Sequence, residues 1–442
     1  MSCKSSRRLV FQLGLSAVCI LLNVQSAPCQ QCGEIVDAGF EAESWTASLP
    51  ADCSIAVGSD YILSLTNLGR SVFTRGGSEL VNESLADFFG FEVDRDAVCL
   101  FDRAESRYFV LMMESFDSLA FGVSDTSDPR DRDDWFFTTW ENPLPGLLDF
   151  PNMTLGPDHV FFTWARTATG TPGQAVIAYA DKEDLLNGQT PALTVFPIGA
   201  ISGQATDRIR AIGCMRMYDQ PSSSIAYFIT DSHSTSGENN MVRLYALDAD
   251  ATINPLVHHD LTVPDYKTAP LKVALPGDAE ITCLWDFKFP VFRNGSAWIA
   301  HAIGRVNAQE EIKTAKVRWH EIAMNGWPLS QEDPTLVQSG TINPGDDISA
   351  FYPVIHVDDD GNVAFAYNQC SPSQHVSIRR AIRKHYDDES TLRAPLLLLQ
   401  SESSLEGSQQ WADYAQMDED AAYPGVMWSH LMWWEGTSTR KT

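Results

Sequence analysis

Basic residues are scarce in this sequence relative to acidic ones. The 442 residues include 31 Lys and Arg against 58 Asp and Glu, which gives a formal net charge of −27. A chain this acidic is repelled by the phosphate backbone of nucleic acids and by anionic membrane surfaces, so we expect neither as a partner. Apolar residues make up 44% of the chain, which is typical of a globular protein and excludes a largely disordered one.

Cysteine is sparse, and the motifs of several enzyme classes are missing. Nine cysteines occur, and Cys29 and Cys32 have C-x-x-C spacing, but no second such pair and no matching His pair accompanies them. A zinc or redox site at this pair is therefore disfavoured against a local disulfide or an inert tail. The sequence also lacks the H-E-x-x-H motif, the G-x-S-x-G elbow and phosphate-binding glycine loops. No catalytic residue is identified by motif.

Long apolar runs are absent except at the N-terminus. Three basic residues lie within the first eight positions, followed by the apolar stretch Leu9–Val24 and then by Ser26 and Ala27. This is the layout of a secretory signal peptide, and the run is shorter than the roughly 20 residues of a membrane span. We predict a signal peptide over residues 1–27, with an uncleaved anchor as the alternative. The mature protein is then secreted, periplasmic or at the cell surface, without a membrane span.

Amphipathic helical stretches are few, and a strand–turn–strand pattern dominates instead. An apolar strand, a tight turn rich in Gly, Asp or Asn, and a second strand rich in aromatic and β-branched residues recur seven times. The copies cover residues 54–67, 97–113, 152–165, 214–230, 290–303, 353–367 and 415–431. Further strand-like runs between copies complete units of four short strands. Short helices are expected only at Ser84–Phe89 and Lys182–Leu186.

Seven units of four strands predict an all-β fold, a seven-bladed β-propeller of four-stranded antiparallel blades. Six or eight blades are the alternatives in number, and a pair of β-sandwiches or a parallel β-helix are the alternatives in fold. We expect a single propeller domain over residues 51–442. Few residues follow Val426, so the last blade is incomplete at the C-terminus. The N-terminal segment 28–50 is therefore expected to close the ring by adding an outer strand.

Several stretches resemble a group of exported bacterial β-propellers, mostly uncharacterised, that are related at fold level to sialidase-like propellers. The resembling stretches are Ser54–Asn67, Leu100–Met113, Gly122–Trp135, Phe150–Ala165, Tyr179–Leu186, Tyr352–Tyr367 and Trp411–Asp420. Each is a blade motif, so the resemblance implies the fold and the order of the blades. It implies no activity, and no functional residue is carried over from it.

Candidate ligand-binding residues stand where the inner strands begin. The register of the copies places Asp149, Asp286, Tyr352, Asp413 and Tyr414 at one mouth of the central channel. The acids would make that mouth negative and suited to cations or neutral sugars, and like charges there could raise a pKa. The tyrosines would offer flat surfaces and hydroxyls. The competing interpretation is that these residues only begin strands and seal the channel.

One acidic turn resembles part of a calcium loop. Asp358, Asp359 and Asp360 precede Gly361, but the full pattern of a calcium-binding loop is missing, and Asp-Gly-Asn is also an ordinary hairpin turn. These three acids are weak candidates for a metal site. We expect no cofactor, with calcium as an open alternative.

Arginines near the beginnings of blades are a further candidate cluster. A sialidase would use such a cluster to bind a carboxylate, and Arg210, Arg216, Arg293 and Arg305 lie in suitable places. The turn motif typical of sialidases is absent, so separate surface arginines are the favoured interpretation.

The combined pattern favours a non-catalytic function. We predict an exported monomeric propeller that binds a protein or a glycan, or serves as a scaffold for one. The alternative is a carbohydrate-active enzyme, a glycoside hydrolase or lyase, that uses carboxylates at the channel mouth. Whether the protein is an enzyme stays open at this stage.

Overall fold

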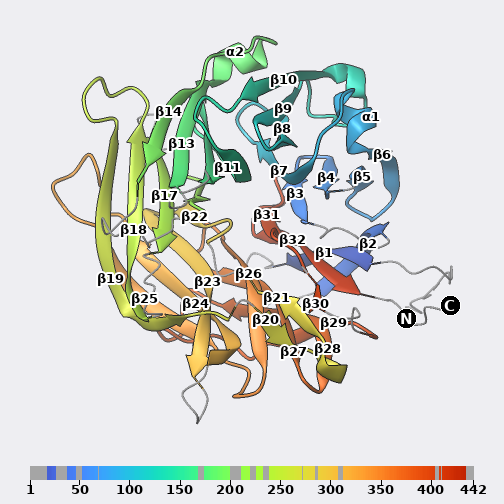
Figure 1. The fold of residues 1–442 in the computed structure, drawn as a ribbon, viewed down its shortest axis with the longest axis vertical. Coiled ribbons are helices and arrows are strands. Elements are labelled where there is room, and N and C mark those ends of the chain that lie inside the picture. The colour runs from blue at the N-terminus through green and yellow to red at the C-terminus, as the bar shows by residue number, and fades with distance from the viewer. Residues whose placement is uncertain are drawn as a thin grey trace.

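The computed structural model is all-β, and its sheets are arranged around a central axis as in a β-propeller (Figure 1). The structure describes residues 17–25, 37–45, 52–67, 69–167, 174–199, 211–219, 225–231, 238–270, 272–283, 287–306, 312–403, 408–409 and 411–434. Among these, no helix is both long enough and apolar enough to cross a membrane.

Four of the sheets each consist of four consecutive antiparallel strands. The first is β3 (Ser54–Val57), β4 (Tyr61–Leu65), β5 (Gly69–Thr74) and β6 (Glu79–Ser84); the second is β7 (Arg95–Asp102), β8 (Arg107–Ser115), β9 (Ser118–Ser124) and β10 (Trp135–Glu141); the third is β11 (Leu147–Leu155), β12 (His159–Thr167), β13 (Gln174–Asp181) and β14 (Thr194–Ile198); the fourth is β26 (Ser349–Val357), β27 (Val363–Ser371), β28 (Gln374–Arg383) and β29 (Leu396–Gln400). Each sheet is one blade, and its first strand lies nearest the axis (Figure 1).

A larger, nine-stranded sheet contains two further antiparallel runs of four strands. One is β15 (Gly213–Cys214), β17 (Ile225–Asp231), β18 (Glu238–Asp248) and β19 (Leu256–Thr268), and the other is β22 (Val291–Arg293), β23 (Ser296–Val306), β24 (Ile312–Ala323) and β25 (Thr335–Ile342). The runs are joined where β19 pairs with β23 and where β16 (Arg216–Met217) pairs with β22. Gly304 allows the first junction, because a Cβ there would clash with the carbonyl oxygen of Thr268.

The last sheet joins the two ends of the chain. The C-terminal strands β31 (Gln416–Glu419) and β32 (Val426–Trp434) are followed outward by β1 (Ala17–Gln25) and β2 (Asp37–Trp45). The outermost strand β2 lies within the segment 28–50 that we expected to close the ring. The third strand, β1, lies within residues 1–27, the segment predicted to be a signal peptide. The signal peptide itself stays a prediction. The same residues cannot both be cleaved off and serve as β1.

The strand–turn–strand copies of the sequence coincide with the hairpins nearest the axis. All seven copies correspond to antiparallel strand pairs, from β3–β4 at the N-terminal side to β31–β32 at the C-terminal side. The expected four-stranded blade is therefore confirmed. The number of blades does not follow from the sheets alone, because the nine-stranded sheet merges two runs.

The remaining elements are short. The predicted helices occur as α1 (Leu85–Phe89) and α2 (Lys182–Leu186), which begin at caps formed by the side chains of Ser84 and Asp181. Two single 3₁₀ turns, η1 (Arg132–Asp134) and η2 (Pro276–Asp278), lie in loops. The strands β20 (Lys272–Ala274), β21 (Glu280–Thr282) and β30 (Ser408–Gln409) form a small separate sheet.

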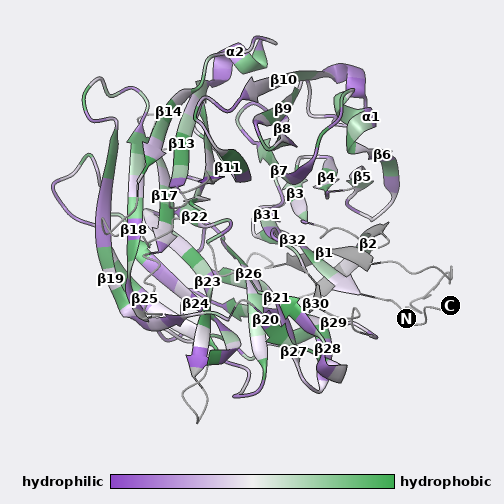
Figure 2. Ribbon diagram, viewed as in Figure 1, coloured by the Kyte–Doolittle hydropathy of each residue, from purple (hydrophilic) through white to green (hydrophobic). Residues whose placement is uncertain are grey.

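Burial decreases from the middle of each blade toward its outer edge. All residues of β27 are buried, whereas the outermost strand β6 has none that is fully buried. Figure 2 shows the same trend, with hydrophobic colours concentrated on the strands nearer the axis. The polar outer strands limit edge-to-edge association, and the packed faces between blades form the core.

Candidate functional site

The inner strands run in the same direction along the axis, so corresponding residues of the copies form layers. β16 and β22 pair in parallel, and β3 contacts both β7 and β31 of the neighbouring sheets. Residues just before the inner strands therefore gather at one end of the axis, and residues that finish these strands gather at the other. At about 3.3 Å per residue, five positions separate the two layers by about 16 Å.

Three acids converge at the first end, which we call the acidic end. Carboxylate oxygens of Asp52, Asp96 and Asp413 lie within 4.8 Å of one another, and all three residues are buried. They come from three different sheets and are brought together only by closure of the ring. Carboxylate oxygens at this spacing could hold a cation or share protons.

The backbone at this end adopts an uncommon conformation. Asp52, Asp96, Phe150 and Tyr352 have φ angles of 51°, 64°, 53° and 47°, in the left-handed region that non-glycine residues rarely adopt. Each lies two residues before the first regularly paired residue of its inner strand, and the pairing of β7, β11 and β26 shifts register there. Such bulges redirect side chains and are over-represented next to functional sites.

Hydrogen bonds hold the acids in place. The side-chain amide of Asn67 donates to Asp52 Oδ2 at 2.6 Å, and its oxygen accepts from the backbone N–H of Asp96 at 2.7 Å. The other oxygen of Asp52 accepts from the backbone N–H of Asp413. The backbone N–H of Phe150 donates to Asp96 Oδ2 at 3.2 Å. The geometry of the trio is therefore set by the strand starts themselves.

Burial and mutual repulsion keep this group from ionising fully. Burial, with a smaller contribution from Asp413, raises the pKa of Asp52 to about 7. The pKa of Asp96 is also raised well above its ordinary value, by burial and then by Asp52, Asp413 and Asp149. Lys288 also lies at the acidic end, with its Nζ 5.2 Å from the ring centroid of Tyr414, and its charge partly offsets the rise in the pKa of Asp96. Near neutral pH the acidic end therefore retains protons that ordinary carboxylates would have lost.

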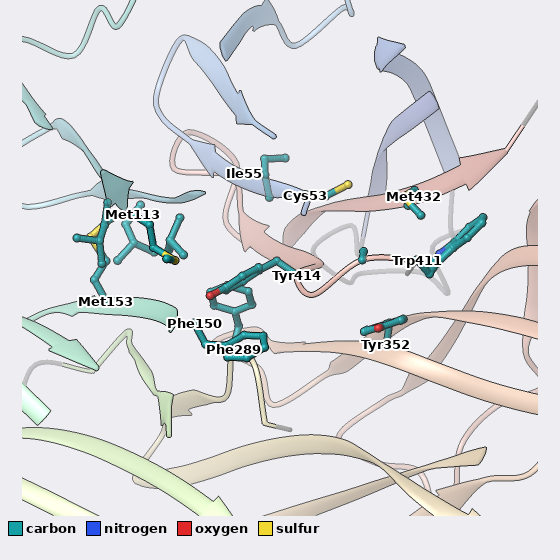
Figure 3. Packing of buried hydrophobic residues seen from close by; sticks show 14 of the residues in the cluster. Cys53, Ile55, Met113, Phe150, Met153, Phe289, Tyr352, Trp411, Tyr414 and Met432 are labelled. Carbon is teal, nitrogen blue, oxygen red and sulfur yellow. The ribbon is translucent and has the colours of Figure 1, made fainter. Parts of the chain in front are cut away.

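The structure places the sequence-predicted ligand residues at or beside the acidic end. Asp413 belongs to the trio, Tyr414 donates its hydroxyl to the carbonyl of Pro151 at 2.9 Å, and Asp149 is half-buried beside Asp96. Tyr414 and Tyr352 are only 1% and 4% exposed. Figure 3 shows Tyr414 next to Phe289, whose ring centroid is 6.0 Å away, and Tyr352 on the side of Trp411.

The fifth predicted residue, Asp286, lies outside the described residues. A ligand role for the five residues stays a prediction, and the burial of both tyrosines favours the interpretation that they seal the channel.

Sequence reasoning missed the other charged residues of the acidic end. Asp52 and Lys288 each lie two residues before their copies, and Asp96 lies directly before its copy. Alignment of the copies by the first regularly paired residue would have placed Asp52 and Asp96 in the layer of Tyr352 and Tyr414, and Lys288 one position before that layer. Each lies before its repeated sequence pattern begins, which concealed that register.

Polar side chains fill the axis between its two ends. Gln416 Nε2 donates to the carbonyl of Cys99 at 3.0 Å, and the backbone N–H of Cys99 donates to Ser54 Oγ at 2.8 Å. Arg216 Nη2 donates to the same Cys99 carbonyl at 3.3 Å. These contacts link four strands, β3, β7, β16 and β31, across the axis, so the two ends form separate sites.

The second end, which we call the arginine end, contains an open cavity of about 210 Å³. Three arginines from three different copies, Arg103, Arg216 and Arg293, contribute to its wall. The other lining residues include two acids, Asp102 and Asp418. The rest are apolar or carry a hydroxyl group: Val57, Leu100, Phe101, Ala104, Thr154, Leu155, Met217 and Tyr218.

Each carboxylate at this end is engaged by a cation. Arg216 Nη1 lies 2.8 Å from Asp418 Oδ1, which also accepts the Tyr218 hydroxyl at 2.8 Å. Glu419, which is fully buried, pairs through Oε2 with Arg293 at 2.8 Å and with Arg103 at 3.0 Å. The charges alternate instead of repelling, in contrast to the acidic end.

Tyr218 is held between charged and aromatic groups. Its ring lies 5.1 Å from the guanidinium carbon of Arg103 and 4.9 Å from that of Arg293. His356 packs against it edge-on with ring centroids 4.6 Å apart. Burial and the neighbouring arginines lower the pKa of His356 well below its ordinary value, so this imidazole is neutral. Burial and Asp418 raise the pKa of Tyr218, so its hydroxyl remains a donor.

The expectation of separate surface arginines is wrong for two of the four candidates. Arg216 and Arg293 are buried and meet at the arginine end, together with Arg103. Arg305 is exposed and lies 3.8 Å from Asp346, and Arg210 lies outside the described residues.

The acidic turn proposed as a calcium loop forms a hairpin turn between β26 and β27. The carboxylate of Asp358 accepts from the backbone and side-chain nitrogens of Asn362 at 2.7 and 2.8 Å. Asp359 pairs with Arg293, and Asp360 is exposed. Calcium at this turn stays a prediction, while the group of acids with metal-ligand spacing in the described chain is the trio at the acidic end.

No protein-family model matches the chain, and no curated protein matches it. Similar solved structures include a variant of the Synechocystis apocarotenoid oxygenase, at 10% identity over 78% of this chain and 71% of the other with a TM-score of 0.42. The WD40 domain of SCAP from fission yeast matches at 9% identity over 90% and 85% of the two chains with a TM-score of 0.40. The α-L-arabinanase of Cellvibrio cellulosa matches at 11% identity over 68% and 94% with a TM-score of 0.32. These low scores carry no argument about a ligand or a reaction.

Proposed function

We propose that the chain is an exported, seven-bladed β-propeller that binds a small neutral polar ligand, such as a sugar unit of a glycan, at the arginine end without transforming it. The count of seven is supported by four sheets of consecutive strands, two four-stranded runs within the nine-stranded sheet, and the sheet that joins the chain ends. It also equals the number of repeated copies in the sequence.

The proposal rests on the ion pairs that hold the two acids of the cavity. General acid–base catalysis needs a carboxylate that gains and loses a proton during the reaction. The two acids that line the cavity are each fixed by a cation: Asp418 by Arg216, and Asp102 by Lys182 with Nζ and Oδ2 2.6 Å apart. Asp418 also accepts the backbone N–H of Val57 at 2.8 Å. Carboxylates held by this many donors are suited to orienting a ligand rather than to exchanging protons with it.

The composition of the wall supports a neutral polar ligand. Its three arginines are balanced by Asp418, Glu419 and Asp359, so an ion of either sign would gain little from entering. Fixed donors and acceptors beside apolar side chains, here Val57 and Met217, match the hydroxyl groups and the C–H face of a sugar ring.

A glycan array followed by calorimetry with the best-binding glycan tests this proposal. We expect Arg103→Ala to weaken binding about tenfold or more, because it removes a guanidinium from the cavity wall. Arg107→Ala is the matched control, because Arg107 lies on the same hairpin and does not line the cavity. Absence of binding to every glycan, equal binding by both variants, or turnover of a bound glycan by the native protein would contradict the proposal.

The acidic end favours a second candidate function, a carbohydrate-active enzyme. Three carboxylates within 4.8 Å and the pKa of about 7 for Asp52 are features of acid–base machinery. Their nearly complete burial argues against direct access by a glycan. A glycosidase screen on the native protein and on Asp52→Asn separates the two functions, because hydrolysis that disappears in this variant would support the enzyme.

Export is part of the proposal and rests on the N-terminal sequence pattern and on the resemblance to exported propellers. Cleavage near Ala27 would remove β1 from the closing sheet and leave β2 to pair with β32 directly. Mass spectrometry of the exported protein identifies its first residue. A first residue near position 28 supports cleavage, whereas a chain that retains Ala17–Gln25 would show that β1 persists.

A further inference from the structure

A second and larger cavity, of about 500 Å³, lies away from the axis. It opens between β25, the strands β27 and β28 of the next blade, and the loop that precedes β29. Ile342 and Leu392 contribute apolar wall, and Gln369, Tyr367 and Arg379 contribute polar groups. A cavity of this volume falls within the size range of small-molecule sites.

The charge of this cavity is opposite to that of the chain. Arg379 and Arg393 line it, and no Asp or Glu does, although the chain as a whole carries a net charge of −27. Arg393 is already paired, with Nε 2.9 Å from Asp387 Oδ2. Arg379 has no ion-pair partner among the described residues, and its Nε is buried without a hydrogen-bond partner there. One positive charge in the cavity is therefore uncompensated.

A buried tyrosine lines the same cavity. Tyr367 is fully buried, and its hydroxyl meets no hydrogen-bond partner among the described residues. Burial raises the pKa of Tyr367 to about 12, so the hydroxyl is a donor at neutral pH. Tyr367 and Arg379 stand directly opposite each other on β27 and β28, so their side chains share one face of the blade. Buried donors without acceptors destabilise a fold, and this pair is oriented toward a cavity that could contain an acceptor.

We propose that this cavity binds a small organic molecule that carries a carboxylate. The guanidinium of Arg379 pairs with the carboxylate, the Tyr367 hydroxyl donates to one of its oxygens, and the uncharged part of the molecule packs against Ile342 and Leu392. A planar guanidinium matches the geometry of a carboxylate, and the apolar wall disfavours a bare inorganic anion. The site is distinct from the arginine end, so the two proposals stand or fall separately.

Calorimetric titration of the purified protein tests the site with benzoate and glucuronate as probes. Benzyl alcohol and glucose are the neutral counterparts, and inorganic phosphate is the anion without an organic part. We expect at least one carboxylate to bind at millimolar concentration or below, and both neutral counterparts and phosphate to bind more weakly by about tenfold or more. Failure of both carboxylates to bind, or equal binding of a neutral counterpart or of phosphate, would overturn the proposal.

Four variants locate the binding. Arg379→Gln is expected to abolish measurable binding, and Tyr367→Phe to weaken it about tenfold. Lys384→Gln, which changes the net charge equally and does not line the cavity, should bind as the native protein does. Tyr367→Phe should also melt at the same or a higher temperature without ligand, because it removes a buried unsatisfied hydroxyl. Unchanged affinity in folded Arg379→Gln and Tyr367→Phe would overturn the assignment, and Arg103→Ala should leave this affinity intact.

Discussion

The two ends of the axis are built from the same repeated strands and handle charge in opposite ways. At the acidic end, Asp52, Asp96 and Asp413 meet as three acids in a buried layer, and the pKa values of Asp52 and Asp96 are raised. At the arginine end, Asp418 and Glu419 are buried as well, but each faces a guanidinium. Burial alone therefore does not decide whether a carboxylate in this protein meets a like charge or a cation. The partner that another blade contributes across the axis decides it.

The largest effect is expected from breaking a pair at the arginine end. Arg216→Ala would leave Asp418 buried without its cation and would remove the hydrogen bond to the carbonyl of Met417. We expect a loss of about 3–5 kcal/mol in the free energy of unfolding. Chemical denaturation measures this loss, with Arg305→Ala as the control.

The control isolates burial as the cause. Arg305 and its partner Asp346 are 54% and 87% exposed, so Arg305→Ala should change stability by no more than about 0.5 kcal/mol. Similar losses in the two variants would show that the buried pair has no special importance.

An intermediate effect is expected at the acidic end and depends on pH. The pKa of Asp52 is raised from 3.8 to about 7, so the folded protein keeps this proton to a higher pH than the unfolded chain does. The stability contributed by the group is therefore complete below about pH 4 and is lost as pH rises to about 7. We expect Asp52→Asn to remove a decline on the order of 2–4 kcal/mol over this range.

Denaturation curves at several pH values measure this decline, with Asp133→Asn as the control because that side chain is 92% exposed. A smaller decline should persist in Asp52→Asn, because Asp96 also has a raised pKa. A pH profile that is the same in Asp52→Asn and in the native protein would mean that the pKa of Asp52 is not raised in the folded protein.

The smallest effect tests whether the tyrosines of the acidic end seal the channel or bind a ligand. Tyr414→Phe removes the hydrogen bond to Pro151 and leaves the packing against Phe289 in place. If Tyr414 seals the channel, we expect a loss of about 1 kcal/mol in stability and no change in glycan binding. A large loss of binding with little loss of stability would instead place the ligand at the acidic end.

Much of the fold could be predicted from sequence because each blade is a local structure. The repeated hairpins, the additional strands and both short helices follow from patterns within a few tens of residues. The closing sheet was only partly predictable. The incomplete last blade indicated that an N-terminal strand was needed, but pairing of β1 with β32 joins residues from opposite ends of the chain.

The candidate sites were less predictable because each depends on several blades. Asp413, Tyr414, Tyr352 and Asp149 were assigned to one end from their register, whereas Asp52 and Asp96 gave no strand signal of their own. For Arg216 and Arg293 the sequence favours separate surface positions over a cluster, since it does not reveal that Asp418 and Glu419 lie opposite them.

By itself, the sequence determined the acidic character of this protein, its strand-rich repeat and the four-stranded blade, because charge, periodicity and turn chemistry are properties of short segments. Only the tertiary structure decided which side chains meet: three acids at one end of the axis, arginines paired with acids at the other, and Tyr367 with Arg379 beside a cavity between blades. The physical reason is that most of these contacts depend on distances between side chains of different blades, and these distances are set by closure of the ring.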